Sequence, residues 1–234
     1  MEHKRLTLFA GHYGSGKTNI AVNYAMHLAA EGKKVCIADL DIVNPYFRTK
    51  DSAKELEEAG VKLISPQFAN SNVDLPALPA EAYRLVTDQN IYGIMDIGGD
   101  DRGAYALGRY VPAIVAENNY RMAFVANCYR PLTRTPEDAL EVMREIEAAC
   151  GLRFTDIINN TNLASETTPE TVLDSVSYVE QLSRISGLPV FATSAERSVA
   201  AQLEGKLPNV LPLQLQEKYF DLPSQKPGNR PLWG

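Results

Sequence analysis

The segment from Gly11 to Thr18 constrains the fold of this chain more than any other feature. It reads Gly-His-Tyr-Gly-Ser-Gly-Lys-Thr and fits the pattern G-x-x-x-x-G-K-[S/T]. The residues before it, 6–10, are typical of a short buried strand, and residues 19–29 after it have the pattern of a helix. A strand, a glycine-rich turn and a helix in this order predict a loop that wraps around phosphate groups.

The residue types in this loop have distinct expected roles. Glycines let backbone N–H groups curl around phosphate oxygens, and the helix N-terminus adds the positive end of its dipole. We expect Lys17 to neutralise the β- and γ-phosphates and the Thr18 hydroxyl to be a ligand of Mg²⁺. The predicted nucleotide-binding residues here are Gly11, His12, Tyr13, Gly14, Ser15, Gly16, Lys17, Thr18 and Asn19.

The composition is that of an ordinary globular protein. The 234 residues, 45% of them hydrophobic and 22% charged, are enough to bury a substantial core. A net charge of −6 argues against a broad electrostatic surface for nucleic acid, which is therefore not an expected partner. No apolar stretch reaches membrane-spanning length, and the first residues lack the pattern of a signal peptide. We therefore expect a cytoplasmic protein with no membrane partner.

Apolar segments typical of strands recur along the chain and alternate with helical patterns. After residues 6–10, the expected strands are 34–39, 61–64, 92–97, 122–127, 155–159 and 188–192. The clearest helices are 136–150, with Thr135 as N-cap, and 169–185, which follows Thr168. This alternation predicts an α/β fold with a doubly wound, mainly parallel sheet.

The chain is expected to form one main domain. Residues 1–206 contain the alternating pattern, with no composition shift that would divide them, and 67–80 are expected to be a long loop. From about residue 207 the sequence becomes proline-rich and irregular. Residues 207–234 are therefore predicted to be an extension that packs on the domain as an extended segment or trails from it.

Carboxylates follow two of the expected strands. In an open parallel sheet, ligands bind beyond the carboxyl ends of the strands. Asp39 and Asp41 end the second strand on the same side if it stays extended, where one could hold a Mg²⁺-bound water or orient an attacking water. The less favoured alternative is that they only cap the next helix or turn. Asp96 ends a later strand and is similar to a Walker B aspartate, with Gly98 and Gly99 placed to let the backbone approach a γ-phosphate.

These motifs together resemble the deviant-Walker ATPase group that contains MinD, ParA, the nitrogenase iron protein and Mrp-type scaffold proteins. The phosphate loop, the Asp39-Leu40-Asp41 segment, the segment from Asp96 to Gly99 and the segment 157–160 carry the resemblance. It implies a three-layer P-loop NTPase fold, with Lys17, Asp41 and Asp96 as catalytic residues. It also implies that Asp41 polarises the attacking water, and that Thr18, Asp41 and Asp96 support Mg²⁺. Asn160, or alternatively Asn159, would contact the base.

One departure from this group concerns His12. Relatives that hydrolyse ATP across a dimer carry a lysine directly after the first glycine of the loop, and this chain has His12 there. A neutral imidazole lacks the fixed charge, although a proton taken up beside phosphates would restore part of it; His12 could also only fill space. Arg102, Arg130 or Arg134 could supply the charge instead. The resemblance makes a homodimer a possible assembly.

Three motifs that the sequence lacks bear on the expected base, on an iron–sulfur cluster and on membrane recruitment. The Asn160-Thr161-Asn162-Leu163 segment lacks the Asn-Lys-x-Asp guanine signature, so adenine is the expected base. The three cysteines, Cys36, Cys128 and Cys150, form no C-x-x-C pair, so buried thiols are expected and an iron–sulfur cluster is not. The last residues lack a basic amphipathic helix, which argues against membrane recruitment.

Three functions fit these observations. The favoured one is an ATP- and Mg²⁺-binding protein that hydrolyses ATP slowly and uses its nucleotide state to change contacts with a protein partner, which the sequence does not identify. The alternative is an enzyme that transfers phosphate to, or activates, a small carboxylate, in the manner of dethiobiotin synthetase or cobyrinate amidase; residues 41–48 would then form the acceptor pocket. A third hypothesis keeps ATP binding without turnover.

Overall fold

The computed structural model describes residues 2–40, 52–64, 80–98 and 101–215, without the side chains of residues 80 and 101–103. In this part of the chain, eight strands form one sheet with the order β3-β2-β4-β1-β5-β6-β7-β8, and every pairing is parallel. The strands are β1 (Leu6–Ala10), β2 (Val35–Leu40), β3 (Lys62–Ile64), β4 (Tyr92–Ile97), β5 (Tyr120–Ala126), β6 (Asp156–Asn159), β7 (Val190–Glu196) and β8 (Val210–Leu213). The predicted parallel α/β sheet is confirmed.

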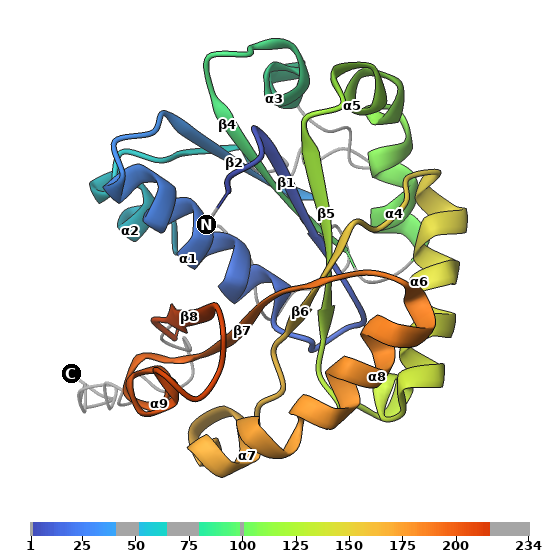
Figure 1. The fold of residues 1–234 in the computed structure, drawn as a ribbon. Helices are drawn as coiled ribbons and strands as arrows, with labels where there is room; N and C mark the ends of the chain where they lie inside the picture. The colour runs from blue at the N-terminus through green and yellow to red at the C-terminus, as the bar shows by residue number, and fades with distance from the viewer. Residues whose placement is uncertain (1, 41–51, 65–79, 99–100, 216–234) are drawn as a thin grey trace, which may run out of the picture.

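Helices cover both faces of this sheet (Figure 1). They are α1 (Lys17–Ala30), α2 (Ala53–Glu58), α3 (Arg84–Thr87), α4 (Asp101–Gly108), α5 (Val111–Glu117), α6 (Pro136–Cys150), α7 (Pro169–Asp174), α8 (Val176–Ser186) and α9 (Arg197–Leu203). Short 3-10 turns are η2 (Ala80–Tyr83), η3 (Pro131–Thr133) and η4 (Ala164–Glu166).

The central strand β1 supplies the core on both faces. Leu6 and Leu8 belong to the core layer that includes residues of α4, α6 and α8. Phe9 points to the other face and packs in the layer formed with α1. Because successive side chains of a strand alternate, each face of β1 is closed by its own helices. The result is a three-layer structure. Helix α1 begins where the loop that follows β1 ends, and it packs on one face of the sheet.

Helix α6 begins where its sequence signal predicts. Thr135 accepts a hydrogen bond from the Asp138 backbone N–H at 3.1 Å, and the Asp138 carboxylate accepts one from the Thr135 N–H at 3.2 Å. Pro136 occupies the first turn, where a missing N–H costs nothing. The reciprocal hydrogen bonds form a capping box, so the predicted cap is confirmed.

The segment predicted as one helix over 169–185 is instead two helices joined at Ser175. The Ser175 hydroxyl donates to the Val172 carbonyl at 2.6 Å and accepts a hydrogen bond from the Asn159 amide at 2.8 Å. A serine that bonds its own preceding turn competes with the helical ladder. The hydrogen bond from Asn159 on β6 holds Ser175 in this non-helical conformation. This hydrogen bond exists only in the folded chain.

Strand β8 adds a short edge strand that the sequence pattern did not identify. Thr193 pairs with Val210 and Glu196 with Leu213, in parallel with β7. Pro212 is exposed in the middle of this strand, and the edge position tolerates its missing donor. Residues 210–213 therefore pack on the domain as an extended segment, while residues 216–234 lie outside the described part of the chain.

The three cysteine thiols are free in the described structure. Cys36 and Cys150 are buried, as predicted, whereas Cys128 is partly exposed. Burial raises the pKa of Cys36 to about 11, with smaller effects of nearby charges. A thiol with such a pKa stays protonated at neutral pH and is a poor nucleophile.

We predict that Thr135→Ala lowers the free energy of unfolding by about 1 kcal/mol, because it removes the side chain that accepts from the Asp138 N–H. Urea denaturation measures the change. Glu141→Ala, at an exposed position of the same helix, is the control and should stay within about 0.5 kcal/mol of the wild type. Equal effects of the two substitutions would contradict the assigned role of the cap.

Candidate functional site

The loop formed by residues 11–16 begins at the carboxyl end of β1 and leads into α1. Strand β1 lies between β4 and β5 in the middle of the sheet. Because all strands are parallel, the segments that follow β2, β4, β5, β6 and β7 emerge at the same edge as this loop. This edge is where open α/β sheets place their ligands.

The loop is held in a tight turn. The Ser15 N–H donates to the His12 carbonyl at 3.1 Å, and the Ile20 N–H donates to the Gly16 carbonyl at 3.2 Å, which begins the helix. Gly11 passes so close to β5 that a Cβ atom would lie 2.6 Å from the Val125 carbonyl oxygen. The glycine at this position is therefore required by packing against the neighbouring strand.

Several polar groups of the loop are shielded from solvent. Lys17 and Thr18, at the start of α1, are 4% and 7% exposed. The Ser15 hydroxyl is fully buried and has no hydrogen-bond partner among the described residues. Tyr13, in contrast, is 52% exposed. Asn19 lies in the first turn of α1, where its carbonyl accepts a hydrogen bond from the Asn23 amide at 2.8 Å.

Asn160 connects the loop to two other strands. Its amide nitrogen donates to the Ser15 carbonyl at 2.6 Å, and its amide oxygen accepts from the Ser194 hydroxyl at 2.7 Å. A Cβ atom on Gly16, whose φ is 90°, would lie 2.2 Å from the same amide nitrogen. Asn160, after β6, thus packs on the loop backbone while Ser194 of β7 supports it. We call Asn160, the Ser15 carbonyl and the Ser194 hydroxyl the Asn160 bracket. The predicted contact of Asn160 with a base stays a prediction.

Arg130 lies against the opposite part of the loop. Atoms Cζ and Nε of its guanidinium lie 3.3 Å from the position that a Cβ atom of Gly14 would take. The Nε atom is buried and has no hydrogen-bond partner among the described residues. The turn that carries Arg130 is fixed by Asn127, whose carbonyl accepts from the Arg130 N–H at 3.1 Å and from the Thr133 hydroxyl at 2.8 Å. Arg134, further along, is exposed.

His12 is a neutral group in this setting. Burial lowers its pKa below the ordinary value, and the charges of Lys17 and Arg130 lower it further. The hydrogen bond of Nδ1 to the Tyr13 carbonyl, at 3.0 Å, partly offsets this. Because a carbonyl only accepts, Nδ1 carries the proton and Nε2 is left as an acceptor. At neutral pH the free protein therefore has no fixed charge at this position.

Two buried carboxylates lie side by side at the edge of the sheet. Asp39 of β2 and Asp96 of β4 are paired in register, and both are nearly inaccessible to solvent. Asp96 also pairs with Phe9, whose side chain points to the α1 face. Paired strand residues point to the same face, so both carboxylates lie on the side of the sheet where α1 begins, with Thr18 in its first turn.

Other predicted residues are placed only in part. Gly98 directly follows β4 and is buried. Asp41 and Gly99 lie outside the described residues, as does the side chain of Arg102. Asn159, the alternative base contact, directs its amide to Ser175 in the helical layer.

Sequence reasoning did not identify Ser194 or Asn127 as parts of this edge. Ser194 supports Asn160, and Asn127 fixes the turn that holds Arg130 against the loop. Both are polar residues at or near strand ends, the same signal that led to Asp39 and Asp96.

The donor set suits a nucleotide and Mg²⁺. Backbone N–H groups at a helix N-terminus, a buried lysine and an orphaned serine hydroxyl favour an anion within the loop. Carboxylate and hydroxyl oxygens are the ligands that Mg²⁺ prefers, and Asp96, Asp39 and Thr18 supply them on one face. When bound, Mg²⁺ would neutralise phosphate charge.

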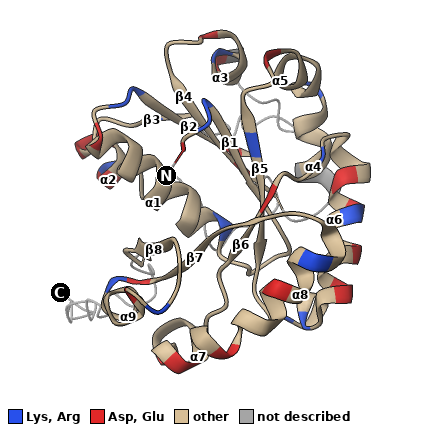
Figure 2. Ribbon diagram, in the orientation of Figure 1, with Lys and Arg blue, Asp and Glu red and all other residues tan. Residues whose placement is uncertain are grey.

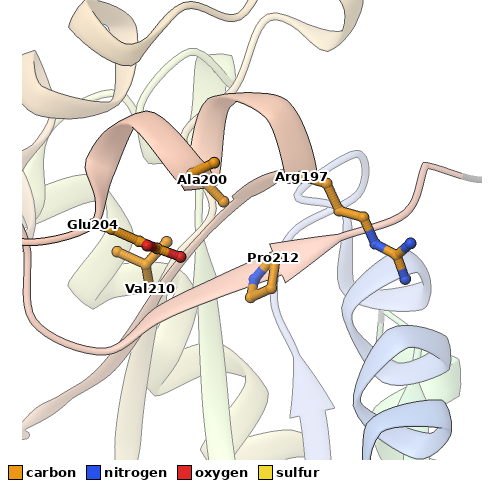
Figure 3. A pocket seen from close by; sticks show the side chains of 6 residues that line it. Arg197, Ala200, Glu204, Val210 and Pro212 are labelled. Carbon is orange, nitrogen blue, oxygen red and sulfur yellow. The ribbon is translucent and has the colours of Figure 1, made fainter.

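A separate shallow pocket of about 210 Å³ lies between α9 and β8. Ala200, Val210 and Pro212 form part of its wall, with Glu204 beside Val210 and Arg197 at the other end (Figure 3). None of the residues that the sequence predicts for the site lines this pocket.

Helices α6 and α8 carry both acidic and basic residues (Figure 2). Among residues 2–40, 52–64, 80–98 and 101–215, we find no helix whose length and apolar character would let it cross a lipid bilayer.

A protein-family model described as the CobQ/CobB/MinD/ParA nucleotide binding domain matches residues 6–187. The match covers most of the chain. It includes the loop, the paired carboxylates and Asn160, whereas Ser194 lies beyond it. No curated protein matches the sequence closely enough to count as a relative.

Solved structures with a similar fold include cell division protein FtsY from Thermotoga maritima, at 19% identity and a TM-score of 0.56, with 83% of this chain and 62% of that chain covered. FtsY from Elizabethkingia anophelis in complex with GDP has 16% identity and a TM-score of 0.49, with 83% and 57% covered. A nucleotide-binding protein in complex with ADP from Archaeoglobus fulgidus has 13% identity and a TM-score of 0.49, with 88% and 90% covered. The alignments thus span less than two thirds of the FtsY chains, and the Thermotoga likeness shows a shared fold.

We predict that the Asn160 bracket acts as a unit. Asn160→Ala should lower the free energy of unfolding by about 1–3 kcal/mol, because it leaves the Ser15 carbonyl and the Ser194 hydroxyl without this partner. Ser194→Ala should cost less, and the double variant should cost less than the sum by about 1 kcal/mol. Urea denaturation of the four proteins measures the cycle. Additive effects would show that the two side chains are not coupled.

Proposed function

The chain belongs to the CobQ/CobB/MinD/ParA nucleotide-binding family, and from that premise we propose that it is an ATP- and Mg²⁺-binding switch protein that hydrolyses ATP slowly. ATP would bind with its phosphates in the loop of residues 11–16 and against Lys17. The nucleotide state would then alter the segments that follow β2 and β4, which carry Asp41 and Gly98. A partner protein, or a second copy of the chain, would read that change.

The observation that carries this proposal is the common placement of the loop, α1 and the paired carboxylates. Asp39 and Asp96 face the side of the sheet on which Thr18 begins α1. Thr18 and Asp96 would support Mg²⁺, while Asp41 would orient the attacking water. Such positioning and charge stabilisation account for most of the catalysis in phosphoryl transfer.

Adenine is the base that we propose, because the segment after β6 reads Asn160-Thr161-Asn162-Leu163 and lacks the lysine and aspartate of the guanine signature. The Asn160 bracket uses one N–H of the amide for Ser15, and we propose that the second N–H of that amide donates to the base. An adenine base bound to this N–H would contact Asn160, the residue that also holds the phosphate loop through the Ser15 carbonyl.

The test of this function separates binding from turnover. Asp41→Ala should keep ATP affinity but reduce ADP formation by at least about 100-fold, because the attacking water loses its positioning group. Lys17→Ala should instead weaken ATP binding by at least about 30-fold, or about 2 kcal/mol. A fluorescent ATP analogue measures affinity and a coupled assay measures ADP.

Two results would contradict the switch. Turnover in Asp41→Ala equal to the wild type would exclude the assigned catalytic role. ADP formation that requires an added small carboxylate would favour the phosphoryl-transfer enzyme instead.

Of Arg130 and Arg134, whose side chains the structure describes, we propose Arg130 as the replacement for the missing lysine. Its guanidinium lies beside the loop, where a Cβ atom on Gly14 would be 3.3 Å from Cζ and Nε, while His12 is neutral. We predict that Arg130→Gln weakens ATP binding about tenfold, through loss of one charge-assisted interaction. Arg134→Gln, at an exposed position nearby, is the matched comparison and should leave ATP affinity within about twofold of the wild type. Equal losses in the two variants would contradict a specific role for Arg130.

His12 should take up a proton when nucleotide binds. Its folded pKa lies below the ordinary value, so at pH near 7 the free protein holds it neutral, and stability falls as the pH drops below the unfolded pKa of about 6.5. Phosphate charges beside the ring favour the protonated form and should raise the pKa. NMR titration of the His12 ring with and without Mg²⁺-ATP measures this. A pKa unchanged by the nucleotide would place the phosphates away from His12.

A further inference from the structure

A group of metal-ligating side chains lies at the far end of α1 from the phosphate loop. His27 is in the last turn of this helix, Glu31 is its C-cap residue, and His3 precedes β1. Figure 1 shows the N-terminal segment beside α1. Within the described part of the chain, the potential ligand atoms of these three residues all lie within 4.8 Å of one another. The group does not take part in the nucleotide site.

The spacing of these atoms brings them within reach of one small divalent ion. His3 Nε2 lies 3.2 Å from one Glu31 carboxylate oxygen, and His27 Nε2 lies 3.3 Å from the other. Ligands at about 2.0–2.1 Å in a tetrahedral zinc site are about 3.3 Å apart. One ion could replace the protons shared between the imidazoles and Glu31, if the ligand atoms, which all lie within 4.8 Å of one another, close up around it.

The His3 ring is already oriented for this role. Its Nδ1 atom is 2.9 Å from the hydroxyl of Tyr24, which is fully buried. Phe9 and Phe191 contact the Tyr24 ring edge-on, with ring centroids at 5.6 and 6.4 Å, and hold it in place. A hydrogen bond donated by the second ring N–H, here from Nδ1 to the Tyr24 oxygen, is how proteins fix the tautomer and direction of a metal-binding histidine. Tyr24 thus leaves His3 Nε2 directed at Glu31.

The remaining surroundings allow an ion to enter. The side chains of His27 and Glu31 are 51% and 38% exposed, whereas that of His3 is 11% exposed. Glu2, which precedes His3 in the chain, is paired with Lys4 at 2.9 Å. Glu31 is therefore the carboxylate that the two imidazoles share.

We propose that His3, His27 and Glu31 bind one Zn²⁺ ion, with the fourth position open to water. Two imidazoles and one carboxylate form a ligand set that suits zinc better than Mg²⁺ or Ca²⁺, which prefer oxygen ligands. The ion would join the segment before β1 to the end of α1. Its binding is independent of the proposed nucleotide function, because Lys17 and Thr18 lie at the opposite end of α1, about 15–20 Å away along the helix.

The experiment is titration calorimetry of the full, chelator-treated chain with Zn²⁺ in the absence of nucleotide. The wild type should bind one equivalent, and His3→Gln and His27→Gln should each weaken binding at least about tenfold. Tyr24→Phe should also weaken binding, by a smaller factor, through loss of the hydroxyl that orients His3. Co²⁺ gives a second readout, because a tetrahedral site with imidazole ligands has a characteristic visible absorption that a merely structural role of these residues would not produce.

The third histidine of the chain provides the control. His12→Asn removes an imidazole from the phosphate loop and should leave zinc affinity unchanged. Circular dichroism and ATP binding of the His3 and His27 variants verify that they fold. A wild-type Kd weaker than about 100 μM, or equal affinity in wild type, His3→Gln and His27→Gln, would overturn the proposal. A loss in His12→Asn as large as in His3→Gln would do so too.

Discussion

The hydrogen bonds of the Asn160 amide are the constraint on which the geometry of the site depends. One side chain holds the Ser15 carbonyl of the phosphate loop and is itself held by the Ser194 hydroxyl. The loop is thereby tied to β6 and β7, while Gly11 packs against the Val125 carbonyl of β5. A loop fixed on both sides presents its N–H groups in one arrangement, so that little conformational entropy is lost when an anion binds.

The positive and the negative side chains at this edge of the sheet occupy different places. Lys17 and Arg130 lie at the loop, whereas Asp39 and Asp96 form a buried pair on the neighbouring strands. A cationic loop next to paired carboxylates suits a phosphate chain that carries a divalent ion between the two groups. In the free protein His12 is neutral, so Lys17 and Arg130 carry the fixed positive charge beside the loop.

The sequence predicts the local parts of this structure and misses those that depend on distant contacts. The phosphate loop, the Thr135 cap and most strands follow from residues close together in the chain, because their patterns are local. The contact of Asn160 with Ser15 spans 145 positions, and the break at Ser175 depends on Asn159, so neither has a local signal. Strand β8 was missed because four residues containing a proline are too few for a recognisable alternation. His27 and Glu31 have helical spacing, but only the fold brings His3 to them.

Titration calorimetry of the wild-type chain with ATP, ADP and GTP in the presence of Mg²⁺ measures whether this edge of the sheet binds adenine nucleotides. We expect one site per chain that binds ATP and ADP and discriminates against GTP, since the guanine signature is missing after β6. Equal affinity for GTP would contradict the assignment of the base while keeping the phosphate site. Failure to bind any of the three nucleotides would contradict the account as a whole.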